Sequence, residues 1–212
     1  MNGVMERINV LCDWLLKLVL IQFYWVLFSL IGLIAFGLIP STMAMFSVTR
    51  QLVINGGDVP LFQTFKKNFL QQFWKGTAVG AMLLITSVIL YVDYRFFIDH
   101  PSLSSIVFLI LVISFCLSIF ACFLFPVYAH FEVGVWEGMK KSTFICLSHL
   151  HYGFIAWVGT GMLITLYLLF SGLLILVGGS TIAMFLTYIG QKVFKTIEKK
   201  YYSLNKEANE LT

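Results

Sequence analysis

Apolar residues occur in long runs along this chain, separated by segments in which apolar and polar positions follow a helical spacing. Five runs approach or exceed the length of a membrane-crossing helix, at about residues 12–39, 77–98, 103–128, 152–171 and 174–194. The last two form one apolar stretch of roughly twice the length that one helix needs, and Ser171-Gly172 and Gly178-Gly179 give it places to turn. The pattern predicts an all-α polytopic transmembrane bundle of about five spans, forming one domain over residues 1–212.

Two segments between the runs are amphipathic and too polar to cross a membrane, at about residues 61–75 and 132–147. In the first, phenylalanines recur at helical spacing on one side and lysine and amide side chains lie on the other. Such a helix is expected to lie at the membrane surface, with its phenylalanines among acyl chains. A surface that docks a partner protein and a simple lipid anchor are both open. The candidate docking residues are Phe62, Phe65, Lys66, Lys67, Asn68, Phe69, Phe73, Glu132, Glu137, Lys140 and Lys141.

Composition supports a membrane protein. Hydrophobic residues make up 59% of the chain and charged residues only 11%, whereas a soluble domain carries about 25% charged residues. The net charge is +4, and no basic cluster is dense enough to indicate nucleic-acid binding. The four cysteines lack the spacing of a disulfide framework or a metal site. The partner that composition itself predicts is therefore the lipid bilayer.

The positions of the positive charges predict an orientation. If all five runs cross, both amphipathic segments and the tail lie on one side, with eleven of the fourteen lysines and arginines. The positive-inside bias assigns that side to the cytoplasm. We therefore expect a multi-pass membrane protein with its N-terminus outside and its C-terminus in the cytoplasm.

Chemistry-bearing residues are sparse. His130, Glu132, Cys146, His149 and His151 share the second amphipathic segment or its borders, but the spacing is poor for a metal site, and histidines at headgroup level are the simpler explanation. Because no catalytic motif and no acidic residue at mid-membrane is recognisable, we expect no catalytic residue, no cofactor and no bound metal. The expectation is that the chain is not an enzyme.

A short internal similarity stands out. Residues 41–46 read Ser-Thr-Met-Ala-Met-Phe, and residues 180–185 read Ser-Thr-Ile-Ala-Met-Phe. We call these the Ser-Thr repeats. Repeats are common in transporters, although two six-residue matches in an apolar chain also arise by chance.

The order of features from about Trp14 to Gly76 resembles the YesL family of small bacterial integral membrane proteins. A Trp-rich first span, a proline, a small-residue helix and a Gly-Asp turn lead to Phe65-Lys66-Lys67-Asn68-Phe69. This resemblance implies a companion of carbohydrate ABC importers, with permease and ATPase subunits as partners. It supplies no active site.

Three functional hypotheses follow. The leading one is a non-catalytic accessory subunit of a bacterial carbohydrate ABC importer, which packs on the permease and presents its cytoplasmic amphipathic helices near the ATPase. The alternative is an independent channel or carrier for small solutes. The third is a membrane enzyme of envelope metabolism that uses His130 and its neighbours.

Overall fold

The computed structural model describes residues 2–34, 36–98, 104–131 and 133–210, and the regular elements among them are all helices. In chain order they are α1 (Asn2–Ile31), α2 (Leu38–Ile54), α3 (Leu61–Ile98), α4 (Ser104–His130), α5 (Val135–Ser148), α6 (Leu150–Leu169), α7 (Ser171–Leu173), the π-helix η2 (Leu174–Gly178) and α8 (Gly179–Glu210). Five helices within the described residues are long and apolar enough to cross a membrane. The predicted all-α, multi-pass membrane protein is confirmed.

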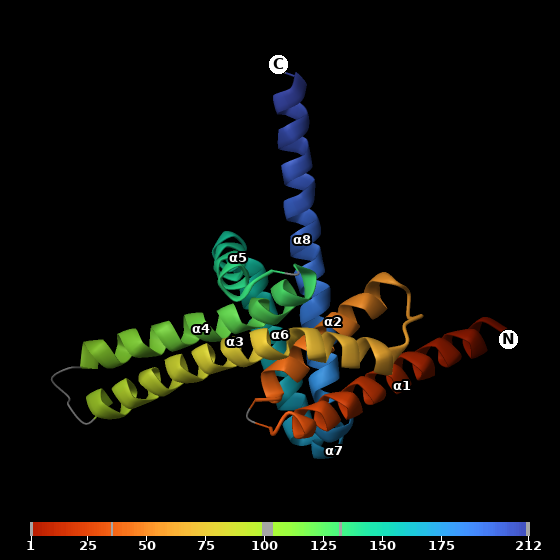
Figure 1. The fold of residues 1–212 in the computed structure, drawn as a ribbon, viewed down its shortest axis with the longest axis horizontal. Coiled ribbons are helices and arrows are strands. Elements are labelled where there is room, and N and C mark those ends of the chain that lie inside the picture. The colour runs from red at the N-terminus through yellow and green to blue at the C-terminus, as the bar shows by residue number, and fades with distance from the viewer. Residues whose placement is uncertain (1, 35, 99–103, 132, 211–212) are drawn as a thin grey trace.

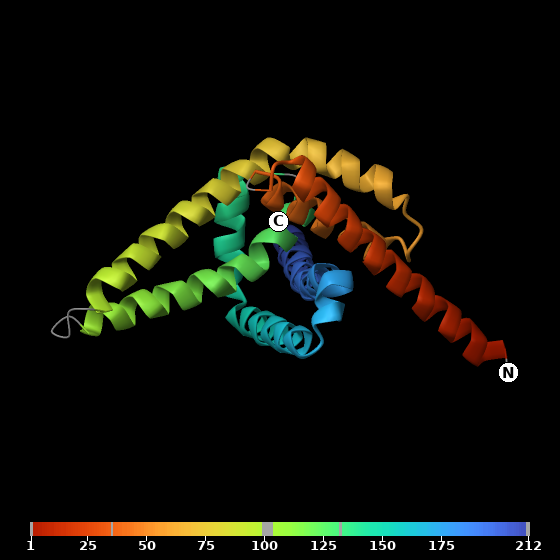
Figure 2. The ribbon, with the colours of Figure 1, turned by 90° about the horizontal axis from the view of Figure 1, so that it is seen from below.

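The helices radiate from a central packing region (Figure 1). The helices α3 and α4 run side by side as one arm, and α1 extends away on the opposite side. In the turned view, the α3–α4 arm and α1 diverge from the centre toward opposite sides (Figure 2). The helix α8 crosses the direction of the α3–α4 arm, and its free end lies far from the end of α1.

The short helix α2 is the centre of the fold. It contacts α1, α3, α4 and α8, and ten of its seventeen residues are buried. Two of its buried hydroxyls donate to the carbonyl four residues earlier, Ser47 to Met43 at 3.0 Å and Thr49 to Met45 at 2.7 Å. Hydroxyls satisfied in this way can be buried without a large desolvation cost. A helix that contacts neighbours on several sides carries apolar or small residues on most of its surface, and in α2 the long polar residues Arg50 and Gln51 come only near its end.

The first span ends earlier than predicted. The expected boundary at about residue 39 is wrong, because α1 stops at Ile31 and α2 begins at Leu38. Pro40 therefore lies in the first turn of α2, where a missing N–H costs nothing. The glycines that border this connection cause the reversal: a Cβ atom on Gly32 would lie 2.4 Å from the Cα of Gly37. Only two residues without side chains let the backbone fold back so closely.

The first amphipathic segment is not a separate helix. Residues 61–75 and 77–98 were expected as two elements, yet α3 runs without a break from Leu61 to Ile98. Gly76 lies where the break was expected, and it is the residue at which α3 crosses α2. Its Cα faces the backbone of Pro40, and a Cβ atom there would lie 2.8 Å from the Cα of Pro40. The glycine thus allows α2 and α3 to pack closely.

The final apolar stretch forms the predicted hairpin. The helix α6 ends at Leu169, the short α7 and η2 reverse the chain, and α8 returns. Both halves of the molecule use the Ser-Thr repeats in the same way. In α2, Thr42 accepts a hydrogen bond from Trp25 of α1 at 3.1 Å, and in α8, Thr181 shares a hydrogen bond with the hydroxyl of Tyr167 from α6. Each repeat therefore ties its helix to an aromatic residue of an earlier helix.

Candidate docking surface

The phenylalanines of residues 61–75 face the protein interior. Phe65 and Phe69 are 0% and 4% exposed, and the Phe28 ring of α1 lies 5.2 and 5.1 Å from their ring centroids. The prediction that they reach acyl chains or a partner is wrong. The second half of α1 covers this face because it presents its own aromatic side chains, so both apolar faces are buried against each other.

The phenylalanines at the two ends of this segment mark the edges of the same contact. Phe62 is about half exposed and packs its ring edge on Tyr24, with centroids 5.6 Å apart. Phe73 is partly buried and lies 5.5 Å from Phe69 by the same measure. Neither ring is free to enter a partner's pocket completely.

The opposite side of this part of α3 is the exposed one. Lys66 and Lys67 point outward, and Leu70 and Trp74 are 62% and 81% exposed. These four residues follow helical spacing, and we call them the outer face of α3. Sequence reasoning identified the lysines but missed Leu70 and Trp74. The available signal was helical spacing, since Leu70 follows Lys67 by three residues and Trp74 follows Leu70 by four.

The third side of this segment is polar and reaches neighbouring elements. Asn68 donates to the Thr64 carbonyl at 2.9 Å and lines a small cavity of about 210 Å³. From the same side, Gln72 donates to Ser47 of α2 at 3.0 Å, and Lys75 donates to the Val133 carbonyl at 3.4 Å. Asn68 is therefore partly buried, bonds within its own helix and lines this cavity. The contact from Lys75 also ties α3 to the connection before α5.

The helix α5 confirms the second amphipathic segment, with a start at Val135 instead of residue 132. Glu137 and Lys140 are exposed, and the Lys141 ammonium lies 5.0 Å from the centroid of the Phe131 ring. Glu132 lies outside the described residues. Because α5 contacts α3, the two amphipathic segments meet on one side of the molecule.

Close packing fixes the position of α5. The Tyr128 hydroxyl donates to the Val135 carbonyl at 2.6 Å, and the Tyr128 ring lies directly against Gly138, where a Cβ atom would be only 2.3 Å away. Cys146 is buried on the inner side of α5, and burial raises the pKa of its thiol. A neutral buried thiol acts as a small apolar group.

The histidines do not converge. Among the described residues, no three His, Cys, Asp or Glu side chains lie close enough to hold a metal ion together. His130 stacks on Phe194 at 4.4 Å, and its Nε2 lies 3.6 Å from a Glu198 carboxylate oxygen. His149 and His151 lie instead near Tyr152.

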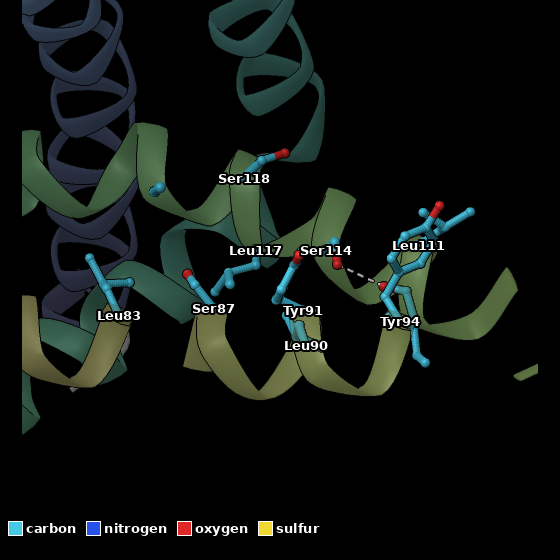
Figure 3. A pocket seen from close by; sticks show the side chains of 11 residues that line it. Leu83, Ser87, Leu90, Tyr91, Tyr94, Leu111, Ser114, Leu117 and Ser118 are labelled. Carbon is cyan, nitrogen blue, oxygen red and sulfur yellow. Dashed lines mark hydrogen bonds between the residues drawn. The ribbon is translucent and has the colours of Figure 1, made fainter. Parts of the chain in front are cut away.

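A groove of about 520 Å³ runs between α3 and α4 within their spans (Figure 3). Its apolar walls carry a row of hydroxyls that the sequence reasoning missed: Ser87, Tyr91 and Tyr94 from α3, and Ser114 and Ser118 from α4. Ser114 donates to the Ile110 carbonyl at 2.8 Å, and Ser118 accepts from Trp157 at 2.9 Å. The hydroxyls of serines can also join helices across a membrane interface.

Comparison with known proteins supports the resemblance inferred from the sequence. The family described as "Protein of unknown function, DUF624" matches residues 18–94. Three proteins of Bacillus subtilis (strain 168), each named as uncharacterized, are similar. YesL is 28% identical over 94% of this chain and 95% of its own length. YteU is 28% identical over 71% and 68%, and YesV is 26% identical over 90% and 93%. No solved structure matches. The chain is therefore similar to YesL and its relatives over most of its length, and its residues 18–94 match this family model.

Proposed function

We propose that this protein is a non-catalytic accessory subunit of a bacterial carbohydrate ABC importer. It packs on the permease and presents the outer face of α3, together with α5, near the junction of permease and ATPase. The observation that carries the proposal is the rigid exposure of Lys66, Lys67, Leu70 and Trp74 on a helix whose apolar face is already occupied. The identity of the partner rests on the family resemblance.

A helix that only anchors a protein to lipid uses its apolar face for the bilayer. In α3 that face is taken by α1, as the burial of Phe65 and Phe69 shows. The side left free carries two lysines beside one large aromatic and one aliphatic side chain. An aromatic anchor within a polar surround is the usual composition of a protein interface hot spot. Because the helix is held in place, little conformational entropy is lost when a partner binds.

The proposed role also needs a contact between the spans of this protein and those of the permease. The groove between α3 and α4 is suited to that contact. Within its span, α3 is covered by α4 on one side and by the central packing region at one end. The rest of its surface is largely exposed. Small residues such as Ser87, Ser114 and Ala121 line the groove, and small residues let transmembrane helices approach one another closely. A partner helix seated there would also find the hydroxyls as hydrogen-bond partners.

The row of hydroxyls also supports a second candidate, an independent carrier of small polar solutes. Solute movement across liposomes that contain only this protein would favour that candidate over the accessory role. Replacing Ser87 and Ser114 with alanine should then reduce the flux.

The orientation predicted from the charge distribution is tested by labelling. In a variant with alanine at all four native cysteines, Ser102→Cys should react with an impermeant maleimide applied to intact cells. Ser203→Cys, in the tail, should react only after the membrane is opened, because an odd number of spans places the two positions on opposite sides. Labelling of both positions from the same side would contradict the five-span arrangement.

The docking proposal predicts the effect of charge reversal on α3. Lys66→Glu combined with Lys67→Glu should abolish co-purification of permease and ATPase subunits from native membranes in mild detergent, as should Trp74→Ala. Reversing two charges at an interface opposes a complementary surface by several kcal/mol. Co-purifying proteins are identified by mass spectrometry.

The matched control is Lys195→Glu with Lys199→Glu. These lysines are exposed on α8, away from the outer face of α3, and the net charge changes equally. The control should retain the partners. If the α3 variants retain them as well, or if wild type brings down no transporter subunit, the accessory role is wrong.

A further inference from the structure

A cleft between α5 and α8 has a volume of about 490 Å³, which falls within the range of small-ligand sites. Its wall is formed by apolar side chains from both helices: Phe144 and Ile145 from α5, and Phe194 and Ile197 from α8. In both views α5 stands beside α8 (Figures 1 and 2). The two helices leave room for a flexible apolar chain between them.

Chain connectivity places this cleft at the depth of lipid headgroups. The helix α5 links His130, the last residue of one candidate span, to Leu150, the first residue of another. Both ends of α5 therefore lie at the same membrane surface. Phe194 and Ile197 belong to the last turns of the span formed by residues 174–199. A phospholipid in the adjacent leaflet can enter the cleft sideways without leaving the bilayer.

The positive charges of this cleft favour binding of an anionic ligand. Lys140 and Lys141 line the cleft, and within the part of the chain that the structure describes neither lysine forms an ion pair. Lys141 is held over the Phe131 ring. The one carboxylate at the cleft, Glu198, has an oxygen 3.6 Å from Nε2 of His130, on the side of α4. Two ammonium groups without an ion pair, beside the apolar wall of one cleft, match a phosphate attached to an acyl chain.

We propose that the cleft between α5 and α8 is a binding site for one anionic phospholipid. Lys140 and Lys141 bind the phosphate of the headgroup, and the apolar wall holds part of an acyl chain. The site is distinct from the outer face of α3, and it does not rest on the accessory role proposed above. A bound lipid would fill the space between α5 and α8.

The test uses the full-length protein, purified in mild detergent and stripped of lipid. Phosphatidylglycerol and phosphatidylcholine are titrated separately, and native mass spectrometry counts bound lipids. Wild type should bind one phosphatidylglycerol in preference to phosphatidylcholine. Lys140→Gln with Lys141→Gln should weaken that binding about tenfold or more, given the contribution of each lysine to anionic-lipid binding. Ile197→Trp should also reduce occupancy by filling the cleft while both lysines remain.

The matched control is Lys195→Gln with Lys199→Gln, which removes the same charge from residues outside the cleft lining. It should bind phosphatidylglycerol as wild type does. Equal binding of the two lipids, undiminished binding by the Lys140 and Lys141 variant, or an equal loss in the control would overturn the proposal. Displacement of phosphatidylglycerol by excess inorganic phosphate would also overturn it, since the site would then recognise free phosphate without the acyl chain.

Discussion

Replacing Phe65 with aspartate is expected to prevent stable folding of the purified protein. Phe65 is completely buried between α1 and α3. Loss of a buried phenylalanine costs about 3–5 kcal/mol, and an unpaired buried carboxylate adds to that loss. Because whole domains are stable by only about 5–15 kcal/mol, little of the variant should remain folded. Thermal unfolding and size-exclusion profiles in mild detergent measure the effect.

The control on the same helix is Leu70→Asp, since Leu70 is 62% exposed. Its midpoint of unfolding should stay close to that of wild type. The comparison separates two arrangements of α3. If the phenylalanine face lay on lipid, Phe65→Asp would release the segment from the membrane but leave the unfolding temperature of the spans unchanged. Similar small effects of both substitutions would therefore contradict the contact between α1 and α3.

Gly76→Leu is expected to destabilise the protein by about 3 kcal/mol, the upper end of what overpacking usually costs. The first added carbon would already lie 2.8 Å from the Pro40 Cα atom and 2.9 Å from its nitrogen. Backbone atoms cannot rotate away as a side chain can, so α2 and α3 must separate. Since α2 contacts four other helices, the displacement spreads through the centre of the fold.

The same change at Gly161 provides the control. Gly161 lies in the interior of α6, and no atom lies within 4 Å of a Cβ built there. Leucine also favours a helix over glycine by roughly 0.5–1 kcal/mol. Gly161→Leu should therefore leave the unfolding midpoint unchanged or raise it. A loss in the Gly161 variant equal to that at Gly76 would show that helix packing at Pro40 is not the cause.

The predictions from sequence succeeded where a single helix determines the pattern. Length and hydropathy were enough to predict five candidate spans, the hairpin after Leu169 and the helix α5. They failed where two helices share a surface. Hydrophobic periodicity shows that Phe65 and Phe69 occupy one side of a helix, but it does not distinguish lipid from another helix as the covering apolar partner.

The same difficulty applies to glycines. Gly76 and Gly161 both lie within apolar helices, but of these two only Gly76 faces a neighbouring backbone. The groove hydroxyls and the cleft between α5 and α8 were also missed. Each is formed by residues from two helices, and pairings between distant segments cannot be predicted from local spacing alone.

The unbroken course of α3 has a mechanical consequence. At about 1.5 Å per residue, its 38 residues form a continuous helix about 57 Å long along its axis, which begins at Leu61 and ends at the far tip of the α3–α4 arm. The helix bends as it passes the centre (Figure 2) and packs on α2 at Gly76. A displacement imposed at one end is therefore transmitted about this contact to the other end. Force applied by a partner on the outer face would reach the distant membrane surface without any rearrangement inside the helix.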